Sequence, residues 1–347
     1  MLIGKLKVGA DAPPVVVAEL SGNHNGSLQR ALAIVDSAAA CGAQALKLQT
    51  YTADTMTLDI KEREFFISNP DSLWKGRSLY ELYQEAFTPW EWHEPLFRRA
   101  NELGMVAFST PFDATSVEFL ESLKVPAYKI ASFENIDLPL IRRVAATGKP
   151  IIMSTGMATL AELDEAVAAA REAGCREMLL LQCTSSYPAD PAHSNLANIP
   201  RLRELFNCEV GLSDHTLGIG ASIASVALGA TLIERHFTLA RADGGVDAVF
   251  SLEPAELQQL VQESRTAWQA LGSVHIGPTA IEMGSRGMRR SLYICEDLAA
   301  GAVLTGKNLR AIRPGLGLPP KFLEQLLGKR VNRTVPRGTP ASWDLIG

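Results

Sequence analysis

The chain lacks several features that mark specialised classes of protein. Its five cysteines lie far apart in 347 residues and form no CxxC pair, which argues against a disulfide framework and predicts a reducing compartment, the cytoplasm. Aromatic residues make up only 7% and the formal net charge is −5, so the chain as a whole is not expected to bind nucleic acid. No GxxxxGKS or GxxxxGKT segment occurs, so a P-loop nucleotide site is not indicated.

Long uncharged runs are also scarce. The longest, 216–233, is long enough to raise the question of a membrane span, but it is rich in Gly, Ala and Ser. We therefore predict that it forms a buried helix followed by a buried strand, and we expect no membrane association. The first residues, MLIGKLKVGADAPP, have neither a long apolar core nor a cleavage pattern, so they do not resemble a signal peptide.

What the chain does contain is typical of a soluble enzyme with two parts. Hydrophobic residues make up 47% and charged residues 20%. Residues 1–285 hold 22 Lys and Arg against 34 Asp and Glu, whereas residues 286–347 hold 11 against 4. This asymmetry indicates an acidic body followed by a small basic module. We expect a catalytic domain over 1–271, a linker over 272–288 and a β-rich module over 289–347.

Eight short apolar runs alternate with amphipathic helical stretches such as 159–174 and 254–272. Near-continuous apolar runs are typical of strands buried on both faces of a parallel sheet. Eight such units predict an α/β fold, a (β/α)8 TIM barrel, with a doubly wound open sheet as the alternative. A long insertion at 51–79, here called the lid insertion, has the length of a functional lid or binding loop. The predicted strands are 15–20, 45–50, 105–110, 127–132, 150–155, 177–183, 208–214 and 231–237.

Charged residues stand where the barrel strands are predicted to end, which is where barrels of this class place their active sites. Lys47 and Lys129 lie inside apolar runs, and a buried charge is costly unless it is paired or functional. The two lysines predict either structural salt bridges or a site for the phosphate of a small substrate. The hydroxyl groups that would complete the phosphate site belong to Thr110, Ser132, Ser154 and Ser213.

Two histidines end adjacent predicted strands, with carboxylates nearby. His215 and His236 together suggest a site for Mn²⁺, Fe²⁺, Co²⁺ or Zn²⁺, because two imidazoles leave coordination positions open for water and substrate. The carboxylates suit general acid–base chemistry, binding of sugar hydroxyls or orientation of a histidine. They belong to Glu19, Glu134, Asp214, Glu234 and Asp247.

These features support two hypotheses from different classes. The first is a metal-dependent, aldol-type transferase or lyase that joins a phosphorylated three-carbon unit to an aldehyde. The second is a protein that binds nucleic acid or another polyanion through its basic C-terminal module. The second is the weaker hypothesis, because the basic residues of 286–347 are not interleaved with aromatic residues for stacking.

Several long segments resemble the sialic acid synthase family over essentially the whole chain, and the last resembles the small antifreeze-like SAF domain that follows the barrel in that family. These segments include AELSGNHNGSL (18–28), ALKLQTYTADTMTL (45–58), FSTPFDATSVEFLESL (108–123), GLSDHTLGIG (211–220), IERHFTLARADGGVDAVFSLEP (233–254) and RRSLYICEDLAAGAVLT (289–305).

The resemblance implies condensation of phosphoenolpyruvate with an N-acetylated amino sugar, which releases phosphate and forms a nine-carbon 2-keto acid. It places a divalent metal, Mn²⁺ with Co²⁺ or Mg²⁺ as alternatives, on His215 and His236. It also implies water activation by Glu19 or Glu234. Phosphoenolpyruvate contacts fall on Lys47, Thr110, Lys129, Ser132, Ser154 and Ser213, and sugar contacts fall on Gln49, Glu134, Tyr187 and Asp247.

Two further implications concern the sugar and the assembly. The sequence has CTSSYP at 183–188, where sialic acid synthases typically carry CTNxYP, so Ser185 replaces an asparagine contact. Together with the lid insertion, this departure favours the pseudaminic branch of the family, whose sugar is 2,4-diacetamido-2,4,6-trideoxy-L-altrose; the N-acetylneuraminate and legionaminic branches are the alternatives. The family dimer is domain-swapped, and Arg313 matches the arginine that one SAF domain contributes to the partner's barrel.

Overall fold

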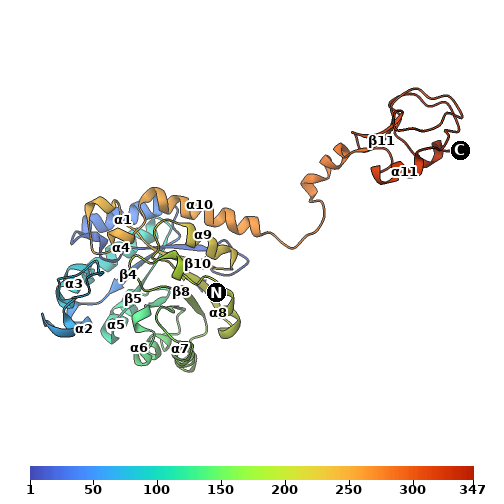
Figure 1. Ribbon diagram of the computed structural model, residues 1–347. Coiled ribbons are helices and arrows are strands. Elements are labelled where there is room, and N and C mark those ends of the chain that lie inside the picture. The colour runs from blue at the N-terminus through green and yellow to red at the C-terminus, as the bar shows by residue number, and fades with distance from the viewer. The chain divides into compact units, whose positions relative to one another are not determined.

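The computed structural model describes residues 1–347, which form two compact units, Met1–Gly272 and Ser273–Gly347 (Figure 1). The division falls one residue after the predicted end of the barrel. Residues 280–288 of the expected linker contain two short 3-10 helices, Ala280–Glu282 and Gly284–Met288.

The first unit is built on a closed barrel of eight parallel strands in the order β10-β3-β4-β5-β6-β7-β8-β9. This finding confirms the predicted TIM-like barrel and rules out the open sheet. Each predicted strand overlaps an observed one, because the apolar runs are buried both inside the barrel and against the helices. The strands are β3 Val15–Glu19, β4 Ala45–Thr50, β5 Val106–Pro111, β6 Tyr128–Ile130, β7 Ile151–Ser154, β8 Met178–Cys183, β9 Glu209–Ser213 and β10 Leu232–His236.

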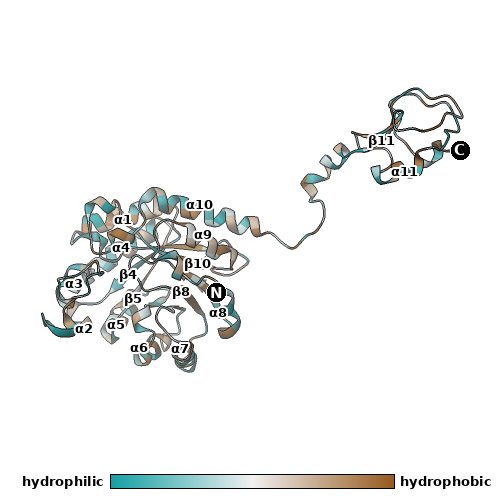
Figure 2. Cartoon of the chain, viewed as in Figure 1, coloured by the Kyte–Doolittle hydropathy of each residue, from teal (hydrophilic) through white to brown (hydrophobic).

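Helices surround the barrel, and hydrophilic and hydrophobic residues alternate along them (Figure 2). Many begin at a side-chain cap: Ser27 accepts from the backbone N–H of Arg30, and Thr159 accepts from that of Glu162. The run 216–233 forms a helix and then the start of a buried strand, as predicted, but the helix is buried along one side only. The helices are α1 Leu28–Ala40, α4 Trp90–Glu102, α5 Ala114–Ser122, α6 Leu138–Ala145, α7 Leu160–Glu172, α8 Asn198–Phe206, α9 Gly220–Ala227 and α10 Pro254–Leu271.

Two apolar layers hold the first unit together. One lies between strands and helices, and the other fills the barrel interior with side chains such as Val17, Phe108 and Leu181. A short hairpin, β1 Leu2–Ile3 with β2 Leu6–Lys7, adds Ile3 and nearby Val8 to the interior layer. This hairpin was not predicted from the sequence, because each of its strands has only two residues.

Short elements complete the two units. The lid insertion contains α2 Ala53–Met56 and the 3-10 helix Arg63–Phe65, and α3 Leu79–Ala86 begins at its end. The second unit packs its own apolar core around an antiparallel pair, β11 Ser291–Ile294 with β12 Leu309–Ile312, and carries α11 Leu323–Leu326. None of the helices combines the length and the apolar character that crossing a membrane requires.

The remaining short elements are 3-10 helices. They are Ser21–His24, Ser132–Glu134, Pro191–His193, Arg241–Asp243, Ala248–Phe250, Pro320–Phe322 and Trp343–Leu345.

Candidate active site

The carboxyl ends of all eight strands meet at one end of the barrel, because the strands are parallel and adjacent. Four charged side chains form the centre of this end. The Nζ of Lys47 lies 2.8 Å from Glu19 Oε2 and 3.4 Å from Glu234 Oε1, and the Nζ of Lys129 lies 3.9 Å from the same Glu234 oxygen. All four residues are buried, with exposed fractions of 5% or less. We call these four residues the charge cluster.

Burial and mutual attraction act in opposite directions on the charge cluster. Desolvation raises the pKa of Glu19 to about 7, although Lys47 works against this shift. The pKa of Glu234 is instead lowered, because both lysines outweigh the cost of its burial. Burial lowers the pKa of Lys129, whereas the two carboxylates raise that of Lys47. Glu19 Oε1 and Glu234 Oε2 accept no hydrogen bond, so both carboxylates can still accept one from a bound molecule.

Hydroxyl groups surround the two lysines. Lys47 Nζ donates to Thr110 Oγ1 at 3.4 Å, and Lys129 Nζ donates to Ser154 Oγ at 2.6 Å. Ser213 Oγ donates to Glu234 Oε1 at 3.0 Å. Ser132 is also buried beside this group, where its Oγ accepts from the backbone N–H of Gly156. The structure thus brings together both predicted lysines and all four predicted hydroxyls, and it contains the predicted ion pairs as well.

The two predicted metal-binding histidines lie next to each other at the ends of β9 and β10. The ring centroids of His215 and His236 are 5.4 Å apart, and Phe250 packs against both rings. His215 Nδ1 lies 3.1 Å from the carbonyl oxygen of Thr184, which leaves Nε2 for another partner. Burial holds the pKa of His236 well below its ordinary value, so its imidazole is neutral, as metal binding requires.

The donor set around the histidine pair suits a divalent cation. His236 Nδ1 is buried without a hydrogen-bond partner, and the Asp247 carboxylate lies 3.7 Å from it. No group of three or more His, Cys, Asp or Glu side chains converges on one metal position. A metal bound here would therefore rely on two imidazoles with water or substrate oxygens. The pair fits such an ion, although the structure does not identify it.

Two of the residues expected to contact the sugar, Tyr187 and Asp247, lie beside the histidine pair. Tyr187 packs against His215, with ring centroids 4.6 Å apart, and the Ser21 hydroxyl donates to Asp247. Ser185 Oγ lies 3.9 Å from the Cys183 sulfur. Gln49 is half-buried on β4, where its Cα pairs in register with that of Thr110.

Glu134 follows β6, and desolvation raises its pKa to about 7 against the opposing effect of Lys129. Its Oε2 is buried without a hydrogen-bond partner.

One predicted residue, Arg313, is not part of this arrangement in a single chain. It is exposed and directly follows β12 in the second unit. Its expected contribution to a barrel stays a prediction.

Some polar residues at the strand ends have roles that the sequence analysis missed. Asp214 accepts from fully buried Arg235, whose Nη1 lies 2.6 Å from Asp214 Oδ2, so this carboxylate is committed to a structural pair. The signal that could have indicated this pair is the presence of an arginine, Arg235, inside the apolar run 231–237. Cys183, the last residue of β8, was also given no role from the sequence. Its pKa is lowered to about 7 against burial, chiefly by His215.

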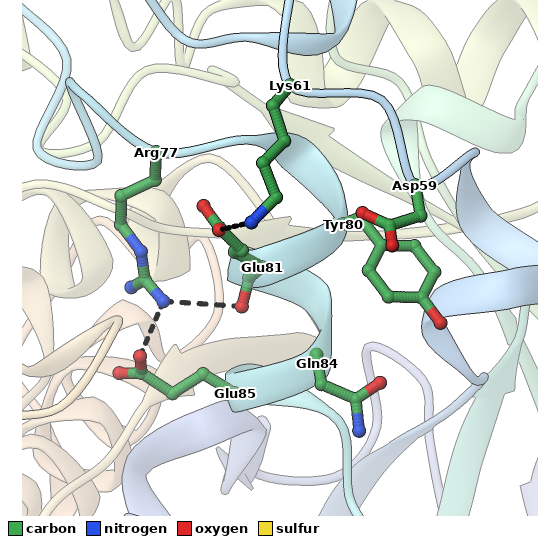
Figure 3. A pocket seen from close by; sticks show the side chains of 7 residues that line it. All are labelled: Asp59, Lys61, Arg77, Tyr80, Glu81, Gln84 and Glu85. Carbon is green, nitrogen blue, oxygen red and sulfur yellow. Dashed lines mark hydrogen bonds and ion pairs between the residues drawn. The ribbon is translucent and has the colours of Figure 1, made fainter.

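A separate hollow of about 530 Å³ lies on the lid insertion and α3 (Figure 3). Its lining is charged: Lys61 pairs with Glu81 and Arg77 pairs with Glu85, each at 2.5 Å. None of its lining residues comes from a strand end. Because its charges are already paired at the surface, this hollow does not compete with the barrel end as the candidate active site.

Comparison with known proteins matches both units. The model of the NeuB family matches residues 34–276, and that of the SAF domain matches residues 289–347. The chain is 42% identical to the pseudaminic acid synthase of Helicobacter pylori, over 96% of this chain and 98% of that protein. It is 36% identical to the N,N'-diacetyllegionaminic acid synthase of Legionella pneumophila, over 97% and 96% of the two chains. A solved structure of N-acetylneuraminic acid synthetase from Leptospira borgpetersenii, in complex with citrate, superposes on this chain with a TM-score of 0.74. The two sequences are 31% identical, and the match covers 82% of this chain and 94% of that chain.

The raised pKa of Glu134 predicts a pH-dependent stability. Between its unfolded pKa near 4.5 and its folded pKa of about 7, the folded protein holds a proton that the unfolded chain has released, so this group lowers stability as pH rises through that window. Relative to wild type, Glu134→Gln should therefore gain on the order of 2 kcal/mol between pH 5 and pH 8.

Urea unfolding at the two pH values measures this difference. Glu94→Gln, at an exposed position of α4, serves as the control and should show no such gain. An equal difference from wild type at both pH values would contradict the raised pKa.

Proposed function

The chain belongs to the NeuB family, as its resemblance to the sialic acid synthases predicted, and on that premise we propose that it condenses phosphoenolpyruvate with 2,4-diacetamido-2,4,6-trideoxy-L-altrose to give pseudaminic acid and phosphate. The observation that carries this function is the convergence of two buried lysines and two histidines at the same strand ends. A phosphorylated carboxylic acid and a carbonyl compound can bind side by side there. The polyanion-binding alternative has only the charge of residues 286–347 in its support.

Phosphoenolpyruvate would bind across the charge cluster. Lys47 and Lys129 supply positive charge in a site with little water, where each ionic hydrogen bond is strong. The hydroxyls of Thr110 and Ser154 already accept hydrogen bonds from these lysines, and their own hydrogens are free to donate to an anion. Holding the carboxylate and the phosphate in this way presents carbon 3 of the enol to the aldehyde.

The bond changes balance with one water molecule. Carbon 3 of phosphoenolpyruvate attacks carbon 1 of the open-chain sugar, and the new alkoxide takes up a proton from solvent. Water adds to the cationic carbon 2 and gives up a proton to a carboxylate, either Glu19 or Glu234. The resulting intermediate expels phosphate with cleavage of the C–O bond, which leaves the 2-keto acid. Both carboxylates lie within 3.4 Å of Lys47 Nζ and are therefore close to the expected substrate.

His215 and His236 are proposed to hold a divalent metal, Mn²⁺ in the first instance. Such an ion would act as a Lewis acid on the aldehyde oxygen of the sugar. The buried, unpartnered Nδ1 of His236 and the neutral state of its ring support this assignment.

The choice of sugar is supported by the pattern of similarity. Pseudaminic acid synthases of Helicobacter pylori and Campylobacter jejuni are 41–42% identical to this chain, whereas legionaminic acid synthases are 34–36% identical. Ser185 is proposed to line the sugar site beside Gln49, Glu134, Tyr187 and Asp247. All five cysteines are unpaired, which supports the proposed cytoplasmic location.

The first test of the function offers three sugars with phosphoenolpyruvate and Mn²⁺ and measures phosphate release. The diacetamido altrose sugar should be used at least about tenfold better in kcat/KM than N-acetylmannosamine, a difference of about 1.4 kcal/mol in transition-state binding. A preference for N-acetylmannosamine would reassign the chain to sialic acid synthesis. A preference for the diacetamido mannose isomer would reassign it to legionaminic acid synthesis.

Removal of the metal should abolish activity while the fold remains, because the two apolar layers of the barrel do not depend on an ion. Treatment with a chelator is the direct experiment, followed by addition of Mn²⁺ or Co²⁺, which should restore phosphate release. His215→Ala and His236→Ala should each reproduce the inactive state with unchanged circular dichroism. Full turnover by metal-free protein would overturn the proposed metal site.

A domain-swapped homodimer is proposed to complete each active site. The net charge is −12 over residues 1–285 and +7 over residues 286–347, which favours docking of a C-terminal module on a barrel. Arg313 would bring a guanidinium to polar groups of the sugar or of an intermediate. Exposed apolar residues that follow β6 and β7 in the chain, Phe133, Ile136, Met157 and Leu160, offer a surface that such a module can cover.

Mixed dimers test this arrangement. Arg313→Ala and Lys47→Ala should each be nearly inactive alone. After subunit exchange, their mixture should recover part of the activity, since a swapped heterodimer contains one site with both residues intact. No recovery after verified exchange would show that Arg313 does not act on the partner's barrel.

A further inference from the structure

Trp74 in the lid insertion connects three segments that lie far apart in the sequence. Its Nε1 donates to the carbonyl oxygen of Val246 at 2.8 Å, across 172 residues. Its ring lies 5.8 Å from the ring of Tyr187, centroid to centroid, and is tilted by 50°. Trp74 therefore contacts both the segment after β8 and the segment after β10, which flank the histidine pair.

The tip of the lid insertion has a defined conformation that presents this indole. Phe66 and Ser78 form an antiparallel bridge, and the backbone N–H groups of Ile67 and Gly76 donate to Arg77 and Ile67. Gly76 has a φ of +86°, which a residue with a side chain adopts only with strain. The backbone around Trp74 is therefore already ordered by this turn. Binding of a ligand against the indole would cost little additional conformational entropy.

The segment that Trp74 holds is also fixed from the opposite side. A Cβ on Gly22 would lie 2.3 Å from Val246 Cγ2, so Gly22 allows Val246 to pack closely against the turn after β3. Asp247, the next residue, accepts from Ser21 and lies 3.7 Å from His236 Nδ1. The hydrogen bond from Trp74 to Val246 thus acts one residue away from a carboxylate of the site.

The aromatic side chains form a continuous apolar surface beside the histidines. Tyr187 contacts Trp74 on one side and His215 on the other, and both Trp74 and Tyr187 are half-buried. Phe250 is buried and packs behind Tyr187 and both histidines. Aromatic faces bind the C–H groups of a sugar, and they suit a sugar with a methyl group at carbon 6 and two acetamido methyl groups. A hydroxyl group at carbon 6 would lose hydration against such a surface without gaining a partner.

We propose that Trp74 is a specificity-determining residue that forms the lid side of the sugar site, with Tyr187 as the other part of its aromatic wall and buried Phe250 supporting Tyr187 from behind. This inference rests on the proposed function and extends it, because it assigns the recognition of the deoxygenated, doubly acetylated sugar to the lid insertion. Phosphoenolpyruvate, bound on the charge cluster, makes no use of this wall.

Steady-state kinetics with each substrate varied in turn test the inference. Trp74→Ala should raise the KM for the diacetamido altrose sugar at least about tenfold and leave the KM for phosphoenolpyruvate within twofold. Its preference for this sugar over N-acetylmannosamine should fall at least about tenfold. Trp74→Phe, which keeps a ring and loses the N–H donor, should fall between Trp74→Ala and wild type.

Trp268→Phe is the matched control, because it removes an indole N–H that also donates to a backbone carbonyl, that of Ala10 at 3.2 Å, and should change neither KM. A sugar KM within twofold of wild type in Trp74→Ala would overturn the inference. Parallel increases in both KM values would also overturn it, because they indicate a general structural effect. In both cases the proposed function stands, since wild-type turnover of the sugar tests that function separately.

Discussion

The architecture of the first unit depends on the mutual pairing of four buried charged side chains. They belong to Lys47, Lys129, Glu19 and Glu234. Transfer of a single charged side chain from water into a protein interior costs several kcal/mol, so none of the four can be buried alone. Each is buried here because an opposite charge lies within 4 Å. That condition requires side chains from β3, β4, β6 and β10 to converge on one small volume, and a closed parallel barrel provides such convergence.

The same cluster explains why the barrel end can act on an anionic substrate. In the free protein the lysines form ion pairs with the carboxylates, and Glu19 Oε1 and Glu234 Oε2 accept no hydrogen bond. A phosphate or carboxylate that approaches Lys129 finds Ser154 already in contact with it and a carboxylate of Glu19 that takes up a proton at moderate pH. Away from the cluster, Asp214 and Arg235 neutralise each other, so they add no net charge to the site.

Much of this organisation could be predicted from the sequence, because buried parallel strands leave a simple apolar pattern. Lys47 and Lys129 could be assigned to the site because each interrupts such a run. The contact of Trp74 with Val246 could not be predicted, since no local pattern relates residues 172 positions apart. The pairing of Arg235 with Asp214 was also missed. Its neighbours Glu234 and His236 were both assigned to the site, and the sequence does not show to which side of β10 the Arg235 side chain points. The position of Arg313 relative to a barrel depends on docking between units, which periodicity in one chain does not encode.

The central claim is that the charge cluster is the binding site for phosphoenolpyruvate, and calorimetric titration of phosphoenolpyruvate without sugar tests it most directly. Wild-type protein should bind one molecule per chain. Lys129→Met should bind at least about thirtyfold more weakly, or about 2 kcal/mol, because it removes a desolvated ionic partner. Lys149→Met is the control, since Lys149 is paired with Glu121 outside the cluster, and it should bind as wild type does. Wild-type affinity in a folded Lys129→Met protein would contradict the account.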